Sequence, residues 1–454
     1  MSKHLLIARL GVTDTVHVPA SGGEVVTELQ MLNTQTQLAH GLSDTVKELL
    51  KQGVYPSPLG VDLLLTAALV YAADTRISRA SESEDTWTRE IRLVVPVVEL
   101  DRWTAIQELL SETLDFLTGD LWTIRFRSAV GLPQIIPERP NGLAAPATNT
   151  VCLFSGGLDS LIGAVDLLQR GETPIFVSHA GDGATSNAQR ECFDALATRY
   201  GKAAVTRFRF WLAFPHNLVR GSVGEDTTRA RSFLFFALAA AVGSGLNRPV
   251  VIRAPENGLI ALNVPLDPLR LGALSTRTTH PYYIARWNEM LSLIGLPCTV
   301  ENPYRHLTKG EMAQNCGDRD FLREIVASSL SCSSPSKARW QSRPTEHCGY
   351  CTPCLIRRAA LEKAFGRGGD PTTYTIESLS TRALDSEKAE GQQVRSFQLA
   401  IEKLRRRPAL ASFLIHKPGP LTDVPGELEQ LADVYRRGMQ EVDEALSGVV
   451  SRPQ

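Results

Sequence analysis

The stretch VCLFSGGLDS, residues 151–160, joins a short apolar run to two adjacent glycines and an Asp-Ser pair. The apolar residues are typical of a short buried strand, and residues 161–168 continue with the apolar period of a helix. A strand that turns through glycines into a helix directs backbone N–H groups and the positive end of the helix dipole toward one point. The stretch therefore predicts an anion site, to which the hydroxyls of Ser155 and Ser160 add donors. The simpler alternative is a glycine turn that binds nothing.

Strands and helices continue to alternate after this stretch. The expected strands are residues 151–154, 174–178, 206–210 and 250–253, and the expected helices are residues 161–168, 188–200 and 229–242. This alternation predicts an α/β fold with a doubly wound, mostly parallel sheet. Ligands of such sheets bind beyond the carboxyl ends of the strands, which is where the glycine turn is expected.

The composition is that of a soluble globular protein, with 43% apolar and 21% charged residues in 454. A formal net charge of −1 gives no support to broad nucleic-acid binding, although a local basic patch stays open. The longest apolar run that we identify, around residues 233–242, is too short to span a bilayer. The start of the chain has no secretory signal, so we expect a cytoplasmic protein without a membrane partner.

The chain is long enough for two or three domains. We expect an α+β accessory or docking domain over residues 1–128, with strands at 5–10 and 91–98 and helices at 61–73 and 103–117. Residues 129–149, rich in Pro, Gly and Ala, resemble a linker. The α/β domain with the glycine turn and a cysteine cluster is expected over residues 150–366, and a helical C-terminal extension over residues 367–454.

The cysteine cluster is the second informative motif. Three thiols lie two residues apart in CGYCTPC, residues 348–354, and Cys332 precedes them. Four thiolates can close a tetrahedral zinc site, which would be structural because it leaves no open position. An iron–sulfur cluster also takes four thiolates and is the main alternative. The simplest alternative is that these cysteines lie in a loop and bind no metal.

The S-G-G-x-D-S loop resembles the pyrophosphate loop, or PP-loop, of the N-type ATP pyrophosphatases. Together with the cysteine cluster it resembles one family, the 7-cyano-7-deazaguanine synthases of queuosine biosynthesis. Two supporting motifs follow in the same order, RARSFLF at residues 229–235 and TKGE at residues 308–311. The resemblance covers about residues 151–358, which is less than half of the chain.

The resemblance implies an enzyme that binds ATP and Mg²⁺ and adenylates the carboxylate of a 7-deazaguanine. An amine then displaces AMP. The implied loop residues in contact with ATP are Ser155, Gly156, Gly157, Leu158, Asp159 and Ser160. Ser178 and His179 are expected near the adenine or ribose. The implied catalytic residues are Asp159, Arg231 and Lys309, and the implied zinc ligands are Cys332, Cys348, Cys351 and Cys354. Arg231 and Lys309 could instead form ordinary surface salt bridges.

We expect Asp159 to lie at an exposed helix N-terminus, where its replacement would cost little stability. The chain departs from the synthase pattern at PENG, residues 255–258, and at TRTTHPY, residues 276–282. Glu256 and Asn257 are therefore expected to contact the substrate, although Asn-Gly is also a plain turn signal. The departures and the additional segments look more like synthase-like proteins of antiphage defence islands (the Qat type). In that branch the acceptor would be an amine on a partner protein.

Three alternatives stay open beside this carbon–nitrogen ligase. The first is a queuosine-pathway synthase that uses ammonia. The second is a tRNA-modifying PP-loop enzyme such as a thiolase, which would need a nucleic-acid surface and usually a redox cysteine pair or an iron–sulfur cluster. The third is a non-catalytic nucleotide-binding subunit of a defence complex.

Overall fold

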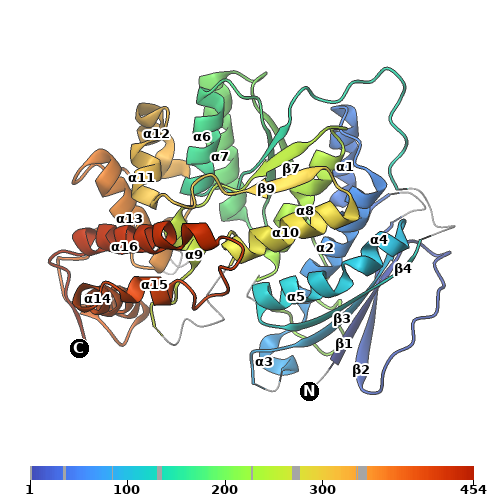
Figure 1. Cartoon of the computed structure of the whole chain (residues 1–454), viewed down its shortest axis with the longest axis horizontal. Helices are drawn as coiled ribbons and strands as arrows, with labels where there is room; N and C mark the ends of the chain where they lie inside the picture. Colours follow the sequence, from blue (N-terminus) through green and yellow to red (C-terminus); the bar gives the residue numbers. More distant parts are fainter. Residues whose placement is uncertain are drawn as a thin grey trace.

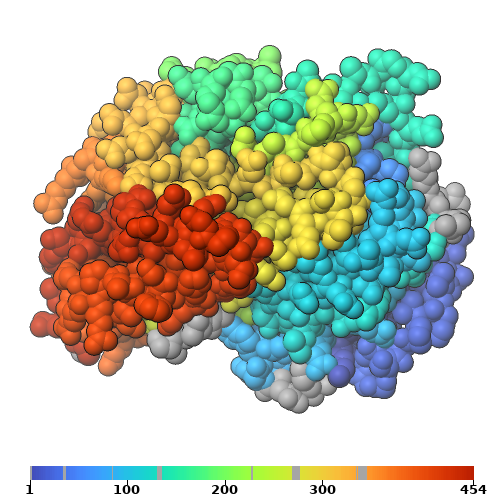
Figure 2. Space-filling model, in the orientation of Figure 1, coloured from blue at the N-terminus to red at the C-terminus, as the bar shows by residue number. Residues whose placement is uncertain are grey.

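The computed structural model of the chain describes residues 3–33, 37–83, 85–129, 135–225, 229–267, 277–333, 335 and 345–453. Figure 1 shows a smaller N-terminal sheet at the lower right, a larger sheet in the upper middle, and the C-terminal helices at the left. In the space-filling view of Figure 2 the three parts are in continuous contact on this face.

The larger sheet has five strands in the order β7-β6-β5-β8-β9, all parallel. Its strands are β5 (Thr150–Leu153), β6 (Ile175–His179), β7 (Thr206–Phe210), β8 (Val250–Arg253) and β9 (Cys298–Glu301). The helices that accompany them are α6 (Leu158–Gln169), α7 (Gly183–Tyr200), α8 (Arg231–Ser244), α9 (Gly258–Leu262) and α10 (Pro281–Ile294). The predicted α/β class with a parallel sheet is confirmed.

Alternate residues of the central strands enter different cores. Val151 and Leu153 pack with α8 and α10, whereas Cys152 packs with α6 and α7. Helices thus cover both faces, which explains why the strands are nearly continuous apolar runs. The chain proceeds outward from β5 to β7 and then returns to β8 on the other side of β5. The switch point of the sheet therefore lies between β5 and β8, and the glycine turn at the end of β5 lies beside it.

The N-terminal sheet has four strands in the order β2-β1-β3-β4, also all parallel. Its elements are β1 (Lys3–Arg9), β2 (Glu24–Gln30), α1 (Leu42–Lys51), α2 (Pro58–Arg76), α3 (Arg79–Glu82), β3 (Glu90–Val97), α4 (Leu100–Ala105), α5 (Gln107–Thr118) and β4 (Leu121–Ser128). The expected α+β architecture of this segment is wrong, because all four strands are parallel and helices connect β2 to β3 and β3 to β4. We missed β2 and β4 in the sequence because polar residues occupy about half of each strand.

The two sheets share one core. Helix α2 is buried along nearly its whole length and packs against α8. The contact is close at Gly60, where an added Cβ would lie 2.2 Å from Ser244 Oγ. Within the described part of the chain, α2 alone is long and apolar enough to cross a membrane, yet 94% of its apolar window is buried inside the protein.

The rest of the chain is mainly helical. Its elements are α11 (Lys309–Gln314), α12 (Arg319–Ile325), η2 (Val326–Ser328), α13 (Thr352–Phe365), β10 (Leu384–Asp385), α14 (Ala389–Arg406), α15 (Leu410–Leu414), η4 (Pro425–Glu427), α16 (Leu428–Ala445) and β11 (Ser451–Arg452). Helix α16 packs on α13, α14 and α9 and also contacts α11. The expected linker has no helix or strand over residues 135–149, whereas residues 130–134 and Thr276 lie outside the described residues.

Candidate nucleotide site and cysteine cluster

The glycine turn adopts the predicted strand–turn–helix geometry. Gly156 has φ +80°, and an added Cβ would lie 3.0 Å from the backbone nitrogen of Gln189. Gly157 is the N-cap of α6, and its N–H donates to Ser155 Oγ at 3.3 Å. Ser155 and Ser160 bring their hydroxyl oxygens within 3.2 Å of one another. The turn thus needs glycine for its conformation and places two hydroxyls side by side.

A cavity of about 260 Å³ opens beside this turn. Its polar lining includes Ser155 and Ser160, Arg229 and Arg231 near the start of α8, and Glu256 after β8. Leu153 and Phe235 are among its apolar lining residues. The cavity therefore lies at the switch point between β5 and β8, which is the usual ligand position in such sheets. Its volume is somewhat below the range of about 300–1,000 Å³ that is usual for small-molecule sites.

Asp159, Lys309 and Asn257 meet beside the turn. Asp159 Oδ1 lies 3.0 Å from Lys309 Nζ, and Asp159 Oδ2 accepts from Asn257 Nδ2 at 2.7 Å. Asp159 is only 8% exposed, so the expected exposed helix N-terminus is wrong. The reason is that Asn257 and Lys309, remote in sequence, cover its carboxylate. Among the described residues, neither Asp159 nor Lys309 lines the cavity.

The two arginines of the cavity are held from behind. Arg231 Nη2 donates to the carbonyl of His179 at 2.9 Å. Arg229 donates to the carbonyl of Thr118 at 2.8 Å, and its guanidinium carbon lies 4.1 Å from the ring centroid of Trp87. Burial lowers the pKa of Arg229 to about 10, so this arginine stays positively charged near neutral pH. Sequence reasoning did not single out Arg229, although it lies in the quoted RARSFLF motif.

Ser178 and His179 lie behind the loop, fully buried. The Ser178 hydroxyl donates to the carbonyl of Phe154 at 2.8 Å. The His179 ring packs edge-on against Tyr71, with ring centroids 5.3 Å apart, and burial lowers its pKa to about 3. His179 is therefore neutral near neutral pH. Neither Ser178 nor His179 is among the described residues that line the cavity. Ser178 supports the residue before the glycine turn, and the His179 carbonyl holds Arg231.

Glu256 and Asn257 have different surroundings. Glu256 lines the cavity and accepts a hydrogen bond from the Thr279 hydroxyl, while Asn302 Nδ2 donates to its carbonyl at 2.8 Å. Asn257 is fully buried and caps α9 by accepting from the backbone N–H of Ile260 at 3.1 Å. Sequence reasoning missed Thr279 because no local motif connects it with a residue 23 positions away.

The pH dependence of stability should report on Glu256. Burial raises the pKa of its carboxyl from 4.5 to about 7, so the folded protein keeps a proton that the unfolded chain releases. This contribution is complete below pH 4.5 and is lost as the pH rises through about 7, which amounts to up to about 3 kcal/mol. Denaturant titrations at about pH 5 and about pH 8 should show the loss in the wild type and not in Glu256→Gln. Equal pH dependence of the free energy of unfolding in the two proteins would contradict the raised pKa of Glu256.

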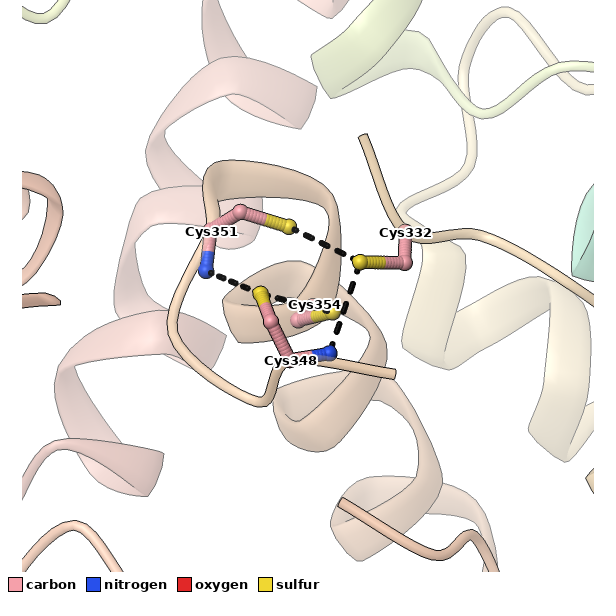
Figure 3. Close-up of side chains that lie close together, drawn as sticks. All are labelled: Cys332, Cys348, Cys351 and Cys354. Atoms are coloured by element: carbon pink, nitrogen blue, oxygen red, sulfur yellow. Dashed lines mark hydrogen bonds between the residues drawn. The ribbon is translucent and has the colours of Figure 1, made fainter. Parts of the chain in front are cut away.

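The four predicted cysteines come together. The Sγ atoms of Cys332, Cys348, Cys351 and Cys354 all lie within 4.8 Å of one another. Figure 3 shows Cys332 approaching on a separate segment from the turn and helix start that carry the other three. Such a group of thiols can hold a metal such as zinc. The segment that leads to Cys332 also contacts the glycine turn, because the Leu330 N–H donates to the carbonyl of Gly156 at 2.8 Å.

Elemental analysis of the purified protein should give about one zinc per chain. Cys351→Ser should lose the metal and lower the midpoint of unfolding, because metal binding and folding are coupled at such sites. Cys316→Ser is the matched control, since Cys316 is a buried cysteine outside the cluster, and it should keep the metal. A brown protein with broad visible absorbance would show an iron–sulfur cluster instead.

Comparison of the chain with protein-family models, with curated proteins and with solved structures finds no significant match. The resemblance to the deazaguanine synthases therefore depends on the four motifs and their order.

Proposed function

We propose that this protein is an ATP-dependent ligase that adenylates a carboxylate and joins the acyl group to an amine. The observation that carries the proposal is the serine-lined glycine turn beside a cavity with two arginines, at the switch point of a parallel sheet. Converging backbone N–H groups, hydroxyls and guanidinium groups suit a phosphate-bearing ligand. The S-G-G-x-D-S resemblance adds that this ligand is ATP.

The chemistry gives each charged residue a role. A carboxylate is a poor electrophile, and adenylation gives it a good leaving group. The barrier comes largely from repulsion between anions, which Arg229 and Arg231 would reduce at the cavity. Asp159 would supply the protein carboxylate for Mg²⁺, which is usually bound by one or two carboxylates together with substrate phosphates. The metal would supply further charge neutralisation. Lys309, whose Nζ lies 3.0 Å from this carboxylate, would add a further positive charge beside the phosphates.

The proposed carboxylate substrate is a 7-deazaguanine, as the resemblance implies. Glu256 and Thr279 fit this class, because together they offer an acceptor and a hydroxyl to the donor edge of a heterocycle. The proposed acceptor is an amine on a partner protein, and the additional N-terminal and C-terminal segments would help to present it. An acyl-adenylate reacts with whichever nucleophile is held nearby, so docking would decide the product.

Isotope exchange tests the adenylation step. Labelled pyrophosphate should enter ATP only when 7-carboxy-7-deazaguanine is present. Arg231→Ala should slow the exchange by about tenfold or more. Arg248→Ala is the control, because Arg248 lies beyond the other end of α8 and donates to the carbonyl of Leu246. Exchange that ignores the carboxylate would contradict the proposed substrate.

Mass spectrometry of candidate partners after reaction with ATP and the carboxylate tests the acceptor. A covalent deazaguanine adduct on a partner amine is expected. Efficient formation of free nitrile from ammonia, with no adduct, would instead make the protein an ordinary queuosine-pathway synthase.

A further inference from the structure

A buried carboxylate from the C-terminal extension contacts the turn that carries Lys309. Glu441 on α16 is 7% exposed. Its carboxylate accepts from the Thr308 hydroxyl and, at 3.2 Å, from the backbone N–H of Gly310. Thr308 and Gly310 directly flank Lys309, so Glu441 forms hydrogen bonds to the chain on both sides of the lysine.

Close packing at Gly310 is independent evidence that this contact is tight. An added Cβ on Gly310 would lie 2.7 Å from Glu441 Oε2 and 2.7 Å from Lys363 Cδ. Only glycine leaves room for the carboxylate at this distance, although Gly310 has no unusual backbone conformation to require it. Lys363 Nζ, 2.8 Å from Glu441 Oε1, in turn fixes the carboxylate.

A second residue of α16 holds the same turn. Arg437 lies one helical turn before Glu441 and donates to the carboxylate of Glu311 and, at 2.9 Å, to the carbonyl of His306. Glu311 also accepts from the backbone N–H of Thr308 at 2.9 Å in a capping box. Residues four apart on a helix share a face, so one face of α16 holds the whole turn.

We propose that Glu441 is a positioning residue, which fixes the start of α11 so that Lys309 Nζ stays beside Asp159 of the nucleotide loop. Its catalytic consequence rests on the proposed function. The C-terminal extension would then be part of the active centre's support and would have a purpose that does not depend on any docking partner.

A double-mutant cycle separates positioning from a general structural role. Glu441→Ala should lower kcat for AMP formation by about 10- to 100-fold, since small misplacements of a catalytic group cost this much. Glu441→Gln keeps one acceptor and should lose less. Glu444→Ala is the matched control, because Glu444 is exposed on the same helix and its carboxylate accepts from Gln440 Nε2 at 3.0 Å, away from Lys309.

In a Lys309→Ala background, Glu441→Ala should cause no further loss of kcat. An equal loss in both backgrounds would overturn the proposal, because it would show that Glu441 acts without Lys309. Gly310→Ala offers a second route, since its methyl group would separate the Glu441 carboxylate from the start of α11 and should reproduce the kcat loss if Glu441→Ala fails to fold. Full activity of Gly310→Ala would also overturn the proposal.

A crystal structure of Glu441→Ala or Gly310→Ala gives a readout that does not depend on the reaction. The Lys309 Nζ to Asp159 Oδ1 distance, 3.0 Å in the wild type, should lengthen beyond hydrogen-bond range. An unchanged distance would overturn the positioning role. If the wild type makes no AMP, the proposed function fails, and this distance still decides the role of Glu441.

Discussion

Replacing Asp159 with asparagine should lower the rate of AMP formation by about 10²- to 10³-fold, the loss typical of removing one group that stabilises transition-state charge. The carboxylate is the proposed Mg²⁺ ligand and the partner of Lys309 at 3.0 Å. Asparagine keeps the shape and an acceptor for Asn257 but removes the charge. Lys309, 7% exposed, loses its carboxylate, so the free energy of unfolding should fall too. Rates are therefore measured well below the unfolding midpoint of the variant.

Asp166→Asn is the matched control for this prediction. Asp166 lies on the same helix α6, where its carboxylate accepts from Tyr304 Oη and, at 2.8 Å, from the backbone N–H of Gly317. It belongs to no part of the cavity lining that the structure describes. Its replacement should leave the rate unchanged. Near wild-type AMP formation by Asp159→Asn would remove Asp159 from the proposed mechanism.

Replacing Arg89 with methionine should lower the free energy of unfolding by about 3–5 kcal/mol. Arg89 is fully buried, and its Nη2 lies 2.9 Å from Asp74 Oδ1 and 2.6 Å from Asp120 Oδ2. Both carboxylates are also buried, and after the replacement Arg79 would still lie beside them. Uncompensated buried charge is the reason for the large cost. Denaturant titration at neutral pH measures it.

Lys3→Met on the same sheet is the control. Lys3 pairs with Glu90 at 2.7 Å, but both side chains are partly exposed, so the cost should stay below about 1 kcal/mol. A cost as small as this for Arg89→Met would contradict the importance of the buried ion cluster.

The buried cluster also connects the N-terminal sheet to the cavity. Asp74 Oδ2 accepts from the backbone N–H of Ala230 at 2.8 Å, directly between the two cavity arginines Arg229 and Arg231. Trp87 and Thr118 contact Arg229 from the same side. The N-terminal segment therefore helps to hold the start of α8. Its use as a docking surface stays a prediction.

The sequence predicted the elements that depend on local pattern. Strand β7 coincides with the expected residues 206–210, and the glycine turn leads into α6 as expected. The cysteine spacing predicted a cluster that includes the remote Cys332. Apolar periodicity and glycine chemistry act over a few residues, so these features can be seen in one chain.

Features that depend on distant partners could not be predicted. The expected helix 103–117 is divided into α4 and α5 at Ile106. The sequence did not reveal this break, because the apolar period is similar on both sides of it. The burial of Asp159 depends on Asn257 and Lys309, which no local pattern connects with it. The contact between Thr308 and Glu441 likewise joins residues 133 positions apart, so no local pattern indicates it. Tertiary contacts of this kind appear only in the folded protein.

Product analysis of ATP tests the central claim most directly. The protein is incubated with Mg²⁺, 7-carboxy-7-deazaguanine and ATP labelled either at the α- or at the γ-phosphate. A pyrophosphate loop predicts cleavage between the α- and β-phosphates, so the γ label should appear in pyrophosphate and the α label in the acyl-adenylate, from which an amine or water releases it as AMP. Recovery of the α label in ADP and of the γ label in inorganic phosphate would contradict the account.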